Sequence, residues 1–87
     1  MSKQTNLIQI KAVSGKKDGK FAVIWKWGRK HLGFTQQLKN GNWANFTKGC
    51  QFSESPTLSD ATWVMKVYLV NKLDPFCDKK FIIDLIK

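Results

Sequence analysis

The chain has 87 residues, 43% of them hydrophobic and 13% aromatic, and its formal net charge is +9. This length and composition indicate one folded domain over residues 1–87, too small for a deep catalytic cleft, and they exclude a disordered chain. No apolar run approaches the length of a membrane span, and the first residues lack the apolar segment of a secretory signal, so we expect a cytoplasmic protein with no membrane partner.

The first predicted strand covers residues 7–13, where Ile8, Ile10 and Ala12 alternate with polar residues. The next six residues, 14–19, have the composition of a turn and predict a basic hairpin loop. A second strand is predicted over residues 21–27. Its odd-numbered residues, Phe21, Val23, Trp25 and Trp27, share one face, and Lys26 lies on the other. We expect Trp25 in the core and Trp27 only partly covered, because the strand ends at Gly28.

The third and fourth strands are predicted on either side of Asn40-Gly41, a dipeptide typical of two-residue type I′ turns. That turn would pair Leu38 with Trp43 and Lys39 with Asn42. One face would then hold Leu32, Phe34, Leu38 and Trp43, and the other Thr35, Gln37, Lys39, Ala44 and Phe46. If the apolar faces of all the strands coincide, the outer surface of the sheet carries Lys11, Lys26 and Lys39 together, with Ile24 and Phe46 between them.

After a polar loop over residues 47–57, a helix is predicted over residues 60–73, with Ser59 or Thr57 as its N-cap and Asp74-Pro75 at its end. The helix would cover the apolar face of the sheet, with Trp63 buried. The pattern of residues 81–87 suits either a strand or a short helix. The predicted fold is therefore α+β, a small antiparallel sheet of about four strands with one helix packed on one face.

The positive charge is concentrated in the first half of the chain. Residues 1–49 hold ten lysines and arginines and one acid, Asp18, whereas residues 50–87 hold five lysines and five acids. Such a surface attracts polyanions, and lysines interleaved with aromatic rings are typical of proteins that bind single-stranded nucleic acid. The predicted nucleic-acid-binding residues are Lys11, Lys16, Lys17, Lys20, Lys26, Trp27, Arg29, Lys30, His31, Lys39 and Phe46.

No catalytic, cofactor or metal motif is present, and the only histidine, His31, has no evident partner. We therefore expect a non-enzymatic protein that binds RNA or single strands. Lysine outnumbers arginine fourteen to one, which fits an AT-rich coding sequence such as that of many bacteriophages. Such a protein would act in the host cytoplasm to blunt a host activity, on RNA or on a host ribonucleoprotein. The alternatives are an inhibitor directed at a host protein, such as an antitoxin or anti-defence factor that uses its basic face, and a small toxin-type ribonuclease.

Overall fold

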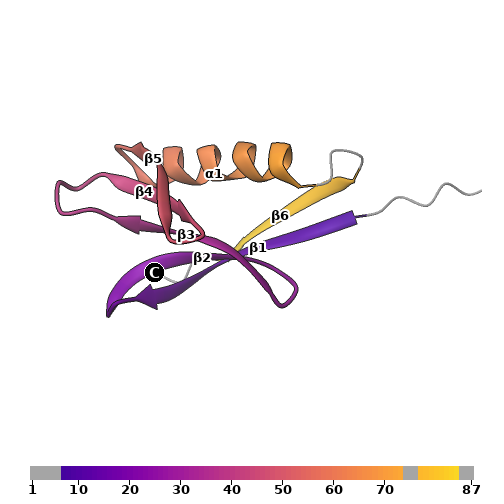
Figure 1. The fold of residues 1–87 in the computed structure, drawn as a ribbon, viewed down its shortest axis with the longest axis horizontal. Coiled ribbons are helices and arrows are strands. Elements are labelled where there is room, and N and C mark those ends of the chain that lie inside the picture. The colour runs from indigo at the N-terminus through magenta and orange to yellow at the C-terminus, as the bar shows by residue number, and fades with distance from the viewer. Residues whose placement is uncertain (1–6, 74–76, 85–87) are drawn as a thin grey trace, which may run out of the picture.

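The computed structural model describes residues 7–73 and 77–84, which form a curled six-stranded sheet and one helix (Figure 1). The first five strands follow one another as antiparallel neighbours: β1 (Leu7–Lys17), β2 (Lys20–Trp27), β3 (Lys30–Gln37), β4 (Trp43–Thr47) and β5 (Cys50–Ser55). The chain then forms α1 (Leu58–Lys72) and returns as β6 (Asp78–Asp84), which pairs parallel with β1. The α+β class is confirmed, but the sheet is mixed and has six strands, not about four.

The two additional strands lie at the edges of the sheet, in the order β5-β4-β3-β2-β1-β6. β5 falls in the segment predicted as a polar loop, because an edge strand needs few apolar side chains and this one has only Cys50 and Phe52. β6 decides the ambiguous C-terminal segment in favour of a strand; residues 85–87, and Asp74-Pro75 at the expected end of the helix, lie outside the described residues.

Two of the turns are type I′, but neither is the predicted one. Asp18-Gly19 and Lys48-Gly49 both have positive φ at their two central residues, which this turn requires. The first of these turns is shorter than the predicted loop of residues 14–19, because β1 extends to Lys17. Asn40 does not have positive φ; Gly41 does, and its amide donates to the Leu38 carbonyl oxygen at 3.0 Å.

The longer turn changes the register of the third hairpin by one residue. Gln37, not Leu38, pairs with Trp43, and Phe34 pairs with Phe46. Because side chains alternate along a strand, a shift of one residue reverses the face to which each side chain points. Thr35 pairs with the core residue Val23 and with Asn45, and it is fully buried under the helix, whereas Phe34 joins Phe46 on the opposite face.

The core lies between the sheet and α1, as predicted, and includes the fully buried Trp25. Its buried apolar residues are Ile8, Ile10, Ala12, Val23, Trp25, Met65 and Leu69. Thr57 is the N-cap of α1, and its side chain accepts a hydrogen bond from the Asp60 amide at 3.1 Å. The helix thus begins two residues earlier than predicted, at Leu58, and ends one residue earlier, at Lys72.

A chain of buried hydrogen bonds joins β2, β3, β4 and α1 inside this core. Trp25 Nε1 donates to Thr35 Oγ1 at 3.0 Å, and the Thr35 hydroxyl donates to Asn45 Oδ1. The Asn45 amide nitrogen donates to Ser53 Oγ at 2.9 Å and to the Ala61 carbonyl oxygen at 2.8 Å. Asn45 is fully buried, so these bonds replace the water that its amide loses on folding.

The expectation that Trp63 is buried is wrong, since 65% of its surface is exposed. Small and flexible residues, Ala61 and Met65 among them, face the sheet instead, which lets α1 approach it closely. Apolar residues surround most of the helix, so its sequence pattern does not select the buried face. Trp63, Val67 and Val70 form an exposed stripe on the solvent side. No helix in the described part of the chain is long and apolar enough to cross a membrane.

Candidate nucleic-acid interface

The face of the sheet opposite α1, here called the outer face, carries the candidate site. Cross-strand register places its side chains in two adjacent rows, each running across several strands. The first row contains Lys11, Lys26 and His31, and the second contains Val13, Ile24, Phe34 and Phe46. From β1 to β4 the second row spans about 14 Å, since neighbouring strands lie about 4.8 Å apart. The predicted proximity of Lys11 and Lys26 is confirmed.

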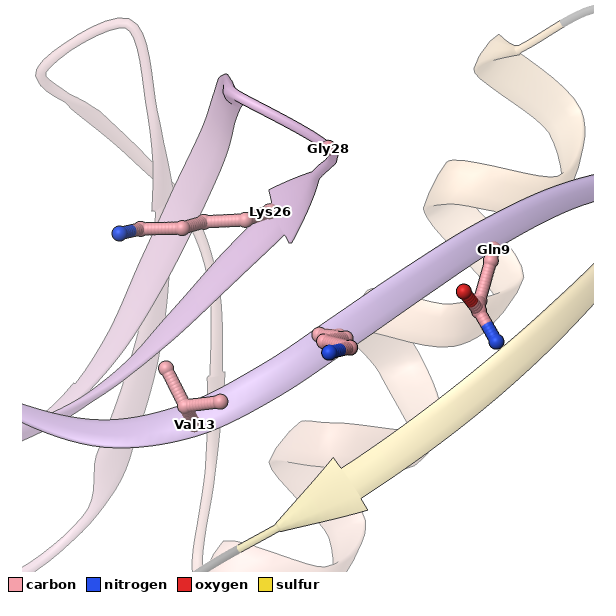
Figure 2. A pocket seen from close by; sticks show the side chains of 5 residues that line it. Gln9, Val13, Lys26 and Gly28 are labelled. Carbon is pink, nitrogen blue, oxygen red and sulfur yellow. The ribbon is translucent and has the colours of Figure 1, made fainter.

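The first row, here called the lysine row, borders a hollow of about 330 Å³ between β1 and the end of β2. Figure 2 shows Gln9 and Val13 on β1, with Lys26 and Gly28 at the end of β2. Lys11 also lines this hollow, directly across from Lys26 in the register. Both ammonium groups belong to exposed residues, so this surface offers two neighbouring positive charges to solvent.

The second row ends in an aromatic hollow of about 430 Å³, which Lys17, His31, Phe34, Phe46 and Lys48 help to line. The Phe34 and Phe46 rings are stacked, with centroids 4.6 Å apart and an interplanar angle of 10°. Lys17 Nζ lies 5.1 Å from the centroid of the Phe34 ring, a cation–π distance. Both rings are half-buried, so they remain accessible from the hollow.

Lys17 reaches this hollow because the sheet curls over its outer face. In the register, Gln36 pairs with Ala22, and Ala22 pairs with Gly15. The Gln36 side chain nevertheless donates from Nε2 to the backbone carbonyl oxygen of Lys17 at 2.9 Å, across the intervening strand β2. This bond holds the end of β1 above β3 and makes the outer face concave at that point.

One acid, Asp18, also lines the aromatic hollow, but it forms no ion pair with the lysines there. Within residues 7–73 and 77–84, no ion pair joins an acid to Lys11, Lys17, Lys26 or Lys48. Glu54 forms hydrogen bonds with amides instead: Asn42 Nδ2 donates to it at 2.6 Å and Asn40 Nδ2 at 3.1 Å. These bonds, and chiefly the one from Asn42, hold the pKa of the exposed Glu54 carboxyl below its ordinary value of 4.5. The lysines therefore keep their charge available for an anionic ligand.

The structure divides the predicted site residues into four groups. Lys11, Lys17, Lys26, His31 and Phe46 meet on the outer face. Trp27 and Lys30 are opposite each other in the register, and Trp27 is also opposite the core residue Ile10, so both lie on the helix side of the sheet. Arg29 lies in the intervening turn. The remaining predicted residues, Lys16, Lys20 and Lys39, lie at the other end of the strands, near the β1–β2 and β3–β4 turns.

Two corrections follow for the predicted site. Lys39 lies in the turn over residues 38–42 and does not join Lys11 and Lys26, because the register differs from the predicted one. Trp27 is 37% exposed, as its place at a strand end suggested, but it faces away from the lysine row. Sequence reasoning also missed Phe34 and Lys48. Gly49, a residue favoured in turns, was the one available signal that placed Lys48 in a turn.

The described residues contain no group of three or more His, Cys, Asp or Glu side chains arranged to hold a metal ion. Cys50 and Cys77 are not joined in a disulfide. Comparisons with protein-family models, curated proteins and solved structures find no match to this chain. The residues described above are therefore the basis on which a function can be assigned.

Proposed function

We propose that this chain is a non-enzymatic protein that binds RNA or other single-stranded nucleic acid on its outer face. The observation that carries the proposal is the stacked Phe34–Phe46 pair in a hollow bordered by Lys17 and Lys48, which form no ion pair within the described residues. Lysines attract the phosphates of any sequence, and an accessible aromatic ring stacks on a base that is not paired with another strand. Both features are needed, because lysines alone would serve any anionic partner.

Single strands are favoured over sequence-specific duplex binding by what α1 presents to solvent. A recognition helix reads base edges in the major groove with arginine, asparagine or glutamine side chains. The exposed stripe of α1 consists of Trp63, Val67 and Val70, and the helix has only one such side chain, the exposed Asn71 next to its last residue. The bases are therefore expected to contact the sheet.

The first experiment measures affinity for a mixed-sequence single strand, as RNA and as DNA, over a series of salt concentrations. Binding that depends on phosphate contacts weakens linearly with log salt, with a slope of about 0.7 per contact for single strands. The double variant Lys11→Ala/Lys26→Ala should lower that slope by about 1.4. Lys39→Ala/Lys66→Ala removes the same charge away from the lysine row and should have a much smaller effect. Undetectable binding of the unmodified protein at low salt would refute the proposal.

The second experiment tests the stacking. Phe46→Leu keeps an apolar side chain but removes the ring, and it should weaken binding by about 1–3 kcal/mol, the contribution of one stacked base. The chain offers a matched control on the helix side, where Phe52 stacks on Tyr68 with ring centroids 4.3 Å apart. Phe52→Leu should leave the affinity unchanged. Equal effects of the two variants would indicate loss of stability and not loss of a base contact.

The same samples address the ribonuclease alternative. A ribonuclease would use His31 as acid or base, with Arg29 and a lysine as electrophiles. We expect RNA to stay intact on long incubation with the unmodified protein and with His31→Gln. The His31→Gln variant should bind RNA with nearly the affinity of the unmodified protein. Cleavage of RNA by the unmodified protein that is lost in His31→Gln would favour the ribonuclease alternative.

In the cell, a protein of this kind would bind host RNA or a ribonucleoprotein and blunt its activity, as expected for a small phage accessory protein.

A second candidate function, inhibition of a protein target, is favoured by the exposed stripe of Trp63, Val67 and Val70. Exposed apolar surface of this kind is typical of protein-binding sites. Matched pull-downs with the unmodified chain, Trp63→Ala and Lys11→Ala/Lys26→Ala separate the two functions. A partner lost with Trp63→Ala and kept with the lysine variant would support the second candidate, and the reverse pattern would favour binding through the basic face.

A further inference from the structure

A second cationic hollow lies at the end of the sheet, between the start of β3, the β4–β5 turn and the last turns of α1. This end pocket has a volume of about 340 Å³, within the range of small-molecule sites. Leu32, Tyr68 and Leu69 provide apolar walls, and Leu69 is only 3% exposed and belongs to the core. The remaining walls include Lys30, Lys48 and Lys72, which come from three different elements.

The three lysines are attached to well-defined parts of the fold. Lys30 begins β3, and its Nζ lies 5.8 Å from the centroid of the Trp27 ring. Lys48 is the first central residue of a type I′ turn, with φ of 53°. Lys72 is in the last turn of α1. No ion pair links any of the three to an acid within the described residues, so their charges all remain available to a ligand.

The end pocket adjoins the proposed nucleic-acid site. His31 and Lys48 line both the aromatic hollow on the outer face and the end pocket. A strand bound on the Phe34–Phe46 pair that continues past His31 therefore enters the end pocket, where α1 forms the far wall. The pocket is thus placed to receive the end of a strand.

We propose that the end pocket binds the terminal phosphate of a single-stranded nucleic acid, with the terminal base against its apolar walls. This inference rests on the proposed function. A phosphodiester inside a strand carries one negative charge, whereas a terminal phosphomonoester carries about 1.5 to 2 at neutral pH. Three lysines around one small pocket match the larger charge of a terminal phosphomonoester better than the single charge of an internal phosphodiester. Trp27 then contributes indirectly, by holding Lys30 at the rim.

The test compares single strands of one sequence that carry a 5′-phosphate, a 3′-phosphate or no terminal phosphate. The unmodified protein should bind one phosphorylated strand about three- to tenfold more tightly than the unphosphorylated strand, since partly exposed charge-assisted contacts contribute this much. Lys72 lines the end pocket and not the outer face. Lys72→Gln should therefore lower affinity for the preferred phosphorylated strand to about that for the unphosphorylated strand, and Lys66→Gln on the same helix should leave the preference intact.

Three outcomes would overturn the inference, and they differ from failure of the proposed function. Equal affinity of the unmodified protein for all three strands would show that the end pocket does not recognise a terminal phosphate. A preference that survives Lys72→Gln would place the phosphate elsewhere. Equal weakening of all three strands by Lys72→Gln, at an unchanged melting temperature, would make the pocket part of a general phosphate path. If no strand binds at low salt, the proposed function itself fails.

Discussion

Replacing Asn45 with alanine should destabilise the fold far more than the loss of one small side chain would suggest. Asn45 is fully buried, and its amide takes part in three hydrogen bonds, with Thr35, Ser53 and the Ala61 carbonyl oxygen. A buried Thr35 hydroxyl without an acceptor costs about 1–3 kcal/mol, and each of the other bonds contributes about 0.5–1.5 kcal/mol. Ser53 is only partly buried and can bind water, so we expect a net loss of about 2–4 kcal/mol.

A domain of this size has a total stability of about 5–15 kcal/mol, so the variant should still fold and its loss can be measured. Urea unfolding followed by circular dichroism gives the free energy of unfolding of both proteins. Asn42→Ala is the matched control, because the Asn42 amide donates to Glu54 on the exposed surface and its loss should shift the unfolding midpoint far less. A cost of less than about 1 kcal/mol for Asn45→Ala would show that the buried network does not hold β4 to α1.

Trp25→Ala should lower the free energy of unfolding by about 3–5 kcal/mol because the ring is fully buried, whereas Trp63→Ala should cost less than about 1 kcal/mol because its ring is mostly exposed. Equal urea midpoints for the two would contradict this assignment. Gly33→Ala should cost at least about 1–3 kcal/mol, since its Cβ would collide with a carbonyl oxygen of β4; a melting temperature like that of the unmodified protein would show that the strands separate easily. Glu54, whose pKa is lowered chiefly by the Asn42 amide, should stabilise the fold above pH 4.5, and this contribution should disappear as the pH falls through its folded-state pKa. Melting temperatures should therefore fall more steeply below pH 4.5 for the unmodified protein than for Glu54→Gln. Parallel plots of melting temperature against pH for the two proteins would count against this contribution of Glu54.

Several features follow from local sequence, and the structure confirms them. The alternation in β1 and β2 places Ile10 and Trp25 in the core and Lys11 and Lys26 on the outer face. Thr57 caps the helix because its side chain reaches a nearby backbone amide, which is a contact within three residues. The concentration of positive charge in the first half of the chain is likewise a property of the sequence alone.

The rest of the candidate site depends on contacts between residues distant in sequence. The Asn40-Gly41 pattern is compatible with both a two-residue and a longer turn, and the buried bonds of Thr35 and Asn45 are satisfied only with the longer one. That register, and not any local signal, brings Phe34 onto Phe46. Sequence alone therefore determined which residues of β1 and β2 share a face, that a helix begins close to Thr57 or Ser59, and where the positive charge lies. Only the tertiary structure decided which aromatic rings meet on the outer face, because strand register is set by hydrogen bonds and packing across the sheet.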